Sequence, residues 1–283
     1  MRAILFLAPL AAWAADDADA IMAKVAANME LASEARRQYV YQQTIRSRML
    51  RTSGQTAREE KREYNVIPAA AETKKDLSRF EGKYQRGKEM IPYDKPGFRY
   101  KGTDLDGDLI SGLTEELVND KKSKDGISHE LFPLRTKDLP GYKFTLTETA
   151  DVKGRSTHKI AFEPKHRQMC VSIGGDDECA TKQWKGDIWV DAAELQPVRI
   201  RTDLSFKIPW GVKVFLGTNI RQLGFSVSYI RVAEGVWFPA SYGTEFRLDL
   251  FWGYKRTITM ALESNGFKRT DAASKVEYRL EDR

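Results

Sequence analysis

Few residues in this sequence have the type and spacing that catalysis or metal binding requires. The three histidines illustrate this. His158 and His166 are eight positions apart, so an extended strand would place both side chains on one face. The cations Lys165 and Arg167 flank His166, which is typical of a solvent-facing segment. No cysteine or paired carboxylate joins these histidines or His129 at the spacing of a metal site or an acid–base pair. The histidines therefore predict neither a metal site nor an acid–base role.

Sequence motifs of common enzymes are also missing. The chain has no G-x-S-x-G elbow, no H-E-x-x-H pair and no phosphate-binding G-x-x-x-x-G-K-[ST] loop. We therefore expect no catalytic residue, no bound metal and no cofactor. The sequence predicts a protein that is not an enzyme. A hydrolase is a distant alternative, because no candidate nucleophile has a base nearby.

An acidic cluster resembles a calcium-binding loop at positions 1, 3, 5 and 12, and its members are Asp104, Asp106, Asp108 and Glu115. Position 6 of this segment is Leu109, where such a loop needs glycine for its sharp turn. We therefore predict that Asp106 and Asp108 cap a helix instead.

The two cysteines favour a structural disulfide. Cys170 and Cys179 bracket the segment VSIGGDDE, in which Gly174-Gly175 is a dipeptide typical of a hairpin turn. A bridge across so short a loop would stabilise the protein by roughly 2 to 3 kcal/mol in an oxidising compartment. Because the spacing is not C-x-x-C and no histidine lies nearby, redox and zinc roles are not favoured.

The first residues read as a secretory signal peptide. Residues 1–15, MRAILFLAPLAAWAA, combine an early arginine, an apolar run and an A-x-A cleavage site. We expect cleavage near Ala14, which divides the chain into a signal peptide, residues 1–14, and one exported, soluble domain, residues 15–283. The alternative is an apolar N-terminal core helix.

The overall composition is that of a packed globular protein. Hydrophobic residues make up 41% of the chain and charged residues 30%. The 46 Lys and Arg exceed the 40 Asp and Glu by only six, which does not resemble the footprint of a nucleic-acid-binding protein. We expect no nucleic-acid partner, whereas an anionic membrane surface is a possible one.

Hydrophobic periodicity predicts two helices. The first begins at Asp17 or Asp19 and ends near Arg36, and the second covers residues 106–119. Between them the charged segment 58–104 is expected to be an insertion, and residues 58–63, charged on both faces, predict a strand pair at an exposed sheet edge.

The rest of the sequence alternates apolar and polar residues with a period of two. The clearest run covers residues 197–208, and a phase slip after Tyr229 predicts a bulge. Each strand therefore has one apolar and one charged face. We predict a mainly β fold, an unclosed antiparallel half-barrel of about eleven strands with helices over its concave apolar face.

One stretch of the sequence resembles a known family. Residues 186–191, GDIWVD, and 195–200, LQPVRI, are similar to a hairpin of the outer-membrane lipoprotein-sorting superfamily, with support from residues 142–144, 162–164 and 235–239. The resemblance implies a periplasmic protein whose half-barrel has a helical lid over a cavity for acyl chains. It also implies that Trp189 and Trp237 pack and that Asp191 and Pro197 set turns, but it assigns no residue to an acyl contact.

Two functional hypotheses follow. The first is a periplasmic carrier or chaperone that holds a lipid or an acylated protein by burying its acyl chain. Its candidate lining residues lie at the centres of the apolar rows and are Ile200, Phe206, Phe225, Val227, Phe246 and Leu248. The second is a non-enzymatic envelope interaction or sensing module with a filled core, which binds partners through residues 58–104 or a free strand edge.

Overall fold

The computed structural model describes residues 10–67, 73–118, 123, 125–152, 154–165, 184–204, 218–221, 224–250 and 253–270. Several predicted features lie outside these ranges: the Cys170–Cys179 bridge, His166, Phe206 and the first nine residues of the signal peptide. Two α-helices are described, α1 (Leu10–Arg36) and α2 (Leu105–Val118), together with short 3₁₀ turns at His129–Leu131 and Leu139–Gly141.

The strands follow one another along the chain with few interruptions. They are β1 (Tyr39–Leu50), β2 (Thr56–Ile67), β3 (Lys74–Arg86), β4 (Glu89–Tyr93), β5 (Tyr142–Val152), β6 (Arg155–Pro164), β7 (Trp184–Asp191), β8 (Pro197–Leu204), β9 (Thr218–Arg221), β10 (Gly224–Ala233), β11 (Val236–Leu250) and β12 (Lys255–Arg269).

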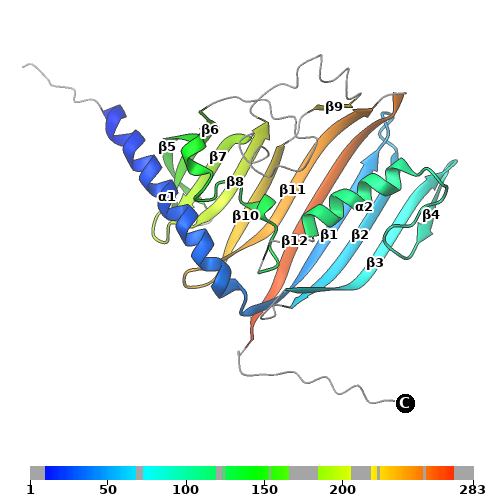
Figure 1. Ribbon diagram of the computed structural model, residues 1–283, viewed down its shortest axis with the longest axis horizontal. Helices are drawn as coiled ribbons and strands as arrows, with labels where there is room; N and C mark the ends of the chain where they lie inside the picture. The colour runs from blue at the N-terminus through cyan, green and yellow to red at the C-terminus, as the bar shows by residue number, and fades with distance from the viewer. Residues whose placement is uncertain are drawn as a thin grey trace, which may run out of the picture.

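All described strands belong to one antiparallel sheet that does not close. Its order is β4-β3-β2-β1-β12-β11-β10-β8-β7-β6-β5, and β9 pairs with β11 off this path. Pairing of β1 with β12 joins the first four strands to the rest. The prediction of an unclosed, mainly β antiparallel architecture is therefore confirmed (Figure 1).

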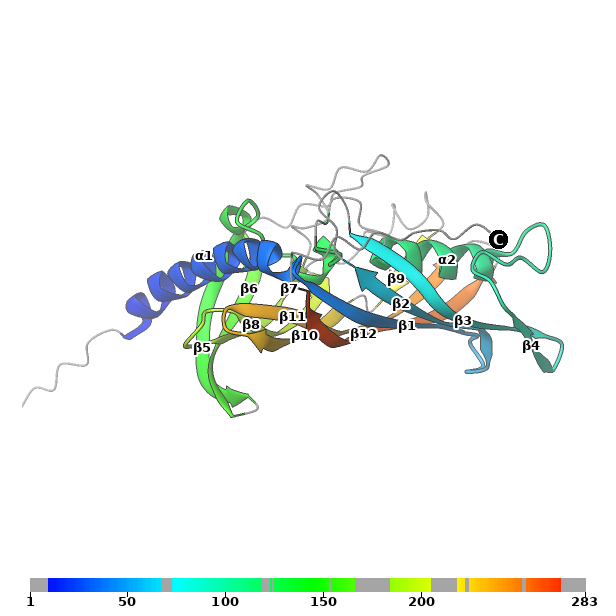
Figure 2. The ribbon, with the colours of Figure 1, turned by 90° about the horizontal axis from the view of Figure 1, so that it is seen from below.

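Both helices lie on the same face of the curved sheet (Figure 2). Helix α1 contacts β5 and β11, whereas α2 contacts β1 and β2 at the other end. The two helices thus cover different parts of one face, which we call the concave face.

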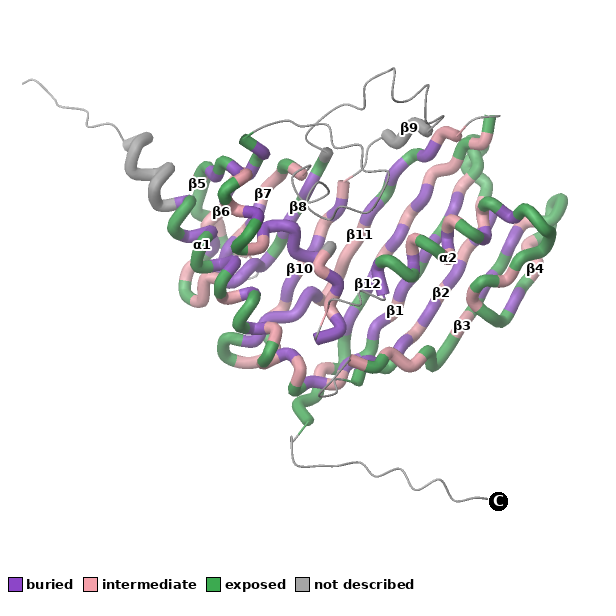
Figure 3. Tube along the Cα trace, viewed as in Figure 1, coloured by how far each residue is buried: buried purple, intermediate pink, exposed green. Residues whose placement is uncertain are grey.

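A continuous apolar row crosses the concave face from strand to strand, because in each pair the facing residues point to the same side. Six of its eight members are at most 1% exposed, and burial alternates along the strands in Figure 3. From β5 to β1, the row is Leu146, Ile160, Ile188, Ile200, Val227, Tyr242, Leu262 and Ile45. The predicted apolar faces of the strands thus form one surface.

Helix α1 is longer than its sequence pattern indicates. It ends at Arg36, as predicted, but it begins at Leu10, so Asp17 and Asp19 lie inside it and do not cap it. The apolar residues that it buries recur at helical spacing, and they are Ala18, Ile21, Met22, Val25, Ala26, Met29 and Ala32. At its end, Arg36 donates to Asp125 at 2.6 Å with both side chains buried. Apolar contacts and the hydrogen bond from Arg36 to the Trp237 carbonyl on β11, at 3.3 Å, therefore hold α1 to the sheet, and the ion pair ties its end to the segment that follows α2.

The charged segment that begins at residue 58 forms β2, β3 and β4. The prediction that residues 58–63 lie at an exposed edge is wrong, because β2 pairs along its length with β1 and β3. The predicted bulge in β10 is confirmed by a register shift between Ser228 and Tyr229.

The two tryptophans named in the resemblance differ in burial. Trp237 is 2% exposed, and its Nε1 donates to Glu194 at 2.9 Å. Trp189 is partly buried, with the cations of Lys159 and Arg199 each 5.5 Å from its ring centroid. Trp237 is therefore a core residue, and Trp189 combines apolar contact with cation–π contact.

Asp191 sets the turn between β7 and β8, as the resemblance implied. Its Oδ1 accepts hydrogen bonds from the backbone N–H groups of Ala193 and Glu194, at 3.1 and 2.8 Å, and Arg155 pairs with its Oδ2. Burial alone would raise the pKa of Asp191, but these hydrogen bonds, first of all that from Arg155, hold the pKa below its ordinary value. Pro197 then opens β8.

We expect Asp191→Asn to lower the free energy of unfolding by about 1 to 3 kcal/mol at neutral pH, because the hydrogen bonds to a charged group are lost. Since the folded pKa lies below the unfolded value of about 3.9, this stabilisation is complete above that pH and disappears as the pH falls further. Urea titrations of both proteins at pH 7 and pH 3 measure this. An equal difference between wild type and variant at the two pH values would contradict the prediction.

Candidate functional site

Five of the six predicted lining residues lie on the concave face and are less than a tenth exposed. Ile200 and Val227 face each other in the apolar row. Phe225 pairs with Thr202 in the adjacent row, and its ring meets that of Trp184 edge to face at 4.9 Å. Phe246 and Leu248 follow on β11. All five belong to one core cluster that also contains buried residues of α1 and α2.

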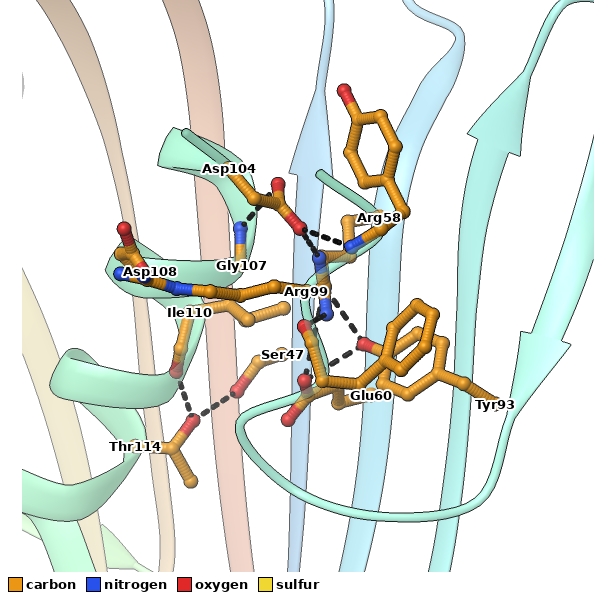
Figure 4. Close-up of polar contacts among 12 residues, drawn as sticks. Ser47, Arg58, Glu60, Tyr93, Arg99, Asp104, Gly107, Asp108, Ile110 and Thr114 are labelled. Atoms are coloured by element: carbon orange, nitrogen blue, oxygen red, sulfur yellow. Dashed lines mark hydrogen bonds and ion pairs between the residues drawn. The ribbon is translucent and has the colours of Figure 1, made fainter. Parts of the chain in front are cut away.

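On β2 the concave face changes from apolar to charged. Its inward positions carry Arg58, Glu60 and Arg62, which are 1%, 4% and 1% exposed. Arg62 stands directly beside Ile45, the last member of the apolar row. We call these three side chains, with Tyr93 and Asp104, the buried charge cluster (Figure 4 shows most of it).

Arg58 lies at the centre of this cluster and uses three of its nitrogens. Nε donates to the Tyr93 hydroxyl at 2.8 Å, Nη1 to Asp104 at 2.7 Å and Nη2 to the carbonyl of Phe98 at 2.5 Å. Its guanidinium also lies 4.6 Å from the centroid of the Tyr93 ring. The Tyr93 hydroxyl in turn donates to Glu60 at 2.7 Å. Burial and the negative charge of Glu60 raise the pKa of Tyr93, so this hydroxyl keeps its proton.

Asp104 links the cluster to α2. Its Oδ1 accepts the backbone N–H of Gly107 at 3.1 Å, and its Oδ2 accepts from Arg58. A β-carbon at Gly107 would lie 2.7 Å from Arg58 Nη1 and from Asp104 Oδ2, so this position needs glycine for the ion pair to reach the helix. The N-cap of α2 is therefore Asp104, and the prediction that Asp106 and Asp108 cap the helix is wrong.

Arginines from other elements pair with the neighbouring acidic residues of α2. Asp106 accepts from Arg256 at 2.8 and 3.0 Å and from the Tyr254 hydroxyl at 2.6 Å. Asp108 accepts from Arg99 at 2.7 Å. These carboxylates thus bind arginines, which is not the arrangement of a calcium loop. Within the described ranges no group of three or more His, Cys, Asp or Glu could hold a metal ion.

Polar contacts continue along the underside of α2. Thr114 Oγ1 donates to the Ile110 carbonyl at 2.7 Å and lies 3.1 Å from the hydroxyl of Ser47 on β1. The apolar side chains that α2 buries are Ile110, Leu117 and Val118. Leu109 and Leu113 also pack against the core. Helix α2 is therefore attached both by apolar contacts and by ion pairs and hydrogen bonds.

A hollow lies on the face opposite the helices. This groove has a volume of about 290 Å³ and crosses β12, β1, β2 and β3. Charged side chains that alternate with the inward residues form its rim, and they are Arg46, Arg48, Glu59, Lys61, Glu81 and Lys83. Because many of them pair with one another or with adjacent charges, as Arg48 does with Glu59 at 3.4 Å, the groove does not suit an apolar ligand.

No protein family model matches this sequence, and no curated protein does. Solved structures do match. A LolA superfamily protein from Nitrosomonas europaea matches over 90% of this chain and 94% of its own, with 13% identity and a TM-score of 0.31. A DUF1329 family protein from Desulfovibrio piger matches over 89% and 95%, with 13% identity and a TM-score of 0.34.

MucB also matches, over 88% of this chain and 94% of its own, with 10% identity and a TM-score of 0.28. At these identities, neither a ligand nor a residue role transfers from those proteins to this chain.

Sequence reasoning missed the buried charge cluster, although a signal was present. Arg58, Glu60 and Arg62 share the parity of Tyr64 and Val66, the apolar end of the same strand. That parity places all five on one face. Because Arg58, Glu60 and Arg62 are charged, the sequence suggested that they face solvent. The side chains that balance their charge come from distant parts of the chain.

Proposed function

We propose that this protein is a non-enzymatic carrier or binding protein that holds the acyl chain of a lipid or of an acylated protein against its concave face. The observation that supports the proposal is the apolar row, which continues over eight strands of an unclosed sheet without a charged residue. Each methylene buried on such a surface contributes about 0.8 kcal/mol, so a chain of about twelve methylenes would contribute on the order of 10 kcal/mol.

In this proposal α2 is the cover that moves, because its ion pairs and hydrogen bonds can be replaced by water and because it buries fewer apolar side chains than α1 does. Helix α1 stays in place, since its release would expose the larger apolar surface. In this proposal the protein is exported to the periplasm, and its signal peptide is removed near Ala14. None of the helices in the described part of the chain has both the length and the apolar character needed to cross a membrane.

The burial of the lining residues favours a second candidate. Ile200 and Val227 are 0% exposed, as expected if the side chains of the protein themselves fill the concave face. In that case the protein is an interaction or sensing module of the cell envelope, with no acyl ligand.

Uptake of an acyl probe distinguishes the two candidates. We expect the protein, exported and extracted gently, to carry adducts of lipid mass in native mass spectrometry and, once delipidated, to enhance the fluorescence of cis-parinaric acid at about one molecule per chain. Arg48→Met changes an exposed side chain on the opposite face and is the control, which should leave uptake unchanged. A spectrum without adducts, together with no fluorescence gain, would leave the interaction module as the function.

A further inference from the structure

At the charged end of the apolar row, Arg62 has hydrogen-bonding capacity that the protein does not use. Its Nε and Nη2 donate to Glu60 Oε2 at 2.9 and 2.6 Å. Its Nη1 is buried and has no hydrogen-bond partner. An unsatisfied buried donor is costly, and native proteins rarely keep one without a reason.

Two features define the surroundings of this nitrogen. Along the row Arg62 stands between Ile45 on β1 and Phe80 on β3, whose ring centroid lies 5.8 Å from the guanidinium carbon. Toward α2, the Glu115 carboxylate lies 3.6 Å from Nη1, too far for a hydrogen bond, and its side chain is 51% exposed. The neighbouring Tyr64 side chain also interacts with the Arg62 guanidinium, and burial raises the pKa of the Tyr64 hydroxyl in spite of that positive charge.

We propose that Arg62 Nη1 binds the carboxylate head of the acyl ligand, which takes the place of Glu115. This inference rests on the proposed function and names its ligand class as an acyl chain with a free carboxylate. A chain lying across the apolar row would bring its head to Arg62, because Ile45 and Arg62 are cross-strand neighbours.

The charge of the cluster supports an anionic head. Arg58 and Arg62 balance Asp104 and Glu60, four side chains that are each 1% exposed, so this inner part is neutral. Glu115 at present supplies one further negative charge from the surface. A ligand carboxylate at Nη1 restores the same charge when Glu115 swings outward, and it can approach to hydrogen-bond distance.

Because Glu115 belongs to α2, head binding and helix release are coupled. A ligand that displaces Glu115 removes one of the attachments of α2 at the moment when the chain needs access to the concave face. A neutral analogue lacks this effect and has to open the helix without it.

The test compares cis-parinaric acid with its methyl ester, which has the same chain without the charge. We expect wild type to bind the acid about tenfold to a hundredfold more tightly, as for a hydrogen bond to a charged group. Glu115→Gln, at a half-exposed position, should increase the affinity for both probes, because it removes one attachment of α2. The increase should be larger for the acid, because no carboxylate of the protein then competes with it for Nη1. Arg62→Met combined with Glu60→Gln, which leaves no unpaired buried carboxylate at Arg62, should bind acid and ester equally.

The outcomes separate this inference from the proposed function. Equal binding of acid and ester by wild type, or a preference for the acid that survives in the Arg62→Met/Glu60→Gln protein, overturns the role of Arg62 and leaves the carrier intact. Binding of neither probe overturns the carrier itself. Circular dichroism and denaturation of each variant establish that it is folded, and Glu115→Gln tests the inference even if the double variant is not.

Discussion

Replacing Arg58 by methionine is expected to lower the free energy of unfolding by about 3 to 5 kcal/mol. The guanidinium is 1% exposed and serves Tyr93, Asp104 and the Phe98 carbonyl together. Without it, Asp104 keeps a buried negative charge with no cation, and the N-cap of α2 loses its anchor on β2. The measurement is chemical denaturation of wild type and variant, followed by circular dichroism.

A lysine at this position should recover only a small part of the loss. Lysine keeps the charge, but it has one nitrogen where the site uses three in a fixed plane. The matched control is Arg48→Met, which removes an arginine from the neighbouring strand. Arg48 is 58% exposed in its side chain and lies 3.4 Å from Glu59, so its loss should cost less than about 1 kcal/mol. Similar losses for the Arg58 and Arg48 variants would contradict the role given to the cluster.

The same residues explain how much of this molecule can be predicted from its sequence. Alternation of apolar and polar residues predicted the faces of β1, β8, β10 and β11 correctly, because one buried face fixes the register of a strand. The phase slip after Tyr229 predicted the bulge for the same reason. Helix α2 followed from its apolar spacing, but the start of α1 did not, since that helix continues into the apolar stretch before Asp17.

The charge cluster could not be derived from local pattern. The cost of burying Arg58 depends on partners that are 35 and 46 residues away in the sequence, Tyr93 and Asp104. Tyr93 reaches Arg58 and Glu60 because β4 places its ring over Gly82. A β-carbon at Gly82 would lie 2.3 Å from an atom of this ring. A pattern of charges reports solvent exposure when no partner is known, and the partners here come from tertiary structure.

Locking α2 to the sheet is expected to abolish acyl binding. The hydroxyls of Ser47 on β1 and Thr114 on α2 are 3.1 Å apart, which brings the two side chains within reach of a disulfide in the Ser47→Cys/Thr114→Cys protein. If α2 has to leave for a chain to reach the apolar row, the oxidised protein should bind cis-parinaric acid at least tenfold more weakly than wild type. Reduction should restore binding, and tryptic mass mapping identifies the new bridge.

Two controls isolate the effect of the lock. Wild type with and without reductant shows whether Cys170 and Cys179 affect uptake, and Ser47→Cys alone shows whether the substitution does. The disulfide also distinguishes the roles of the two helices. It fixes α2 alone, because neither substitution lies on α1 or on the strands that α1 contacts, β5 and β11. Oxidised protein that binds as wild type does would mean that the chain enters without release of α2, and the cover would then have to be sought elsewhere on the concave face.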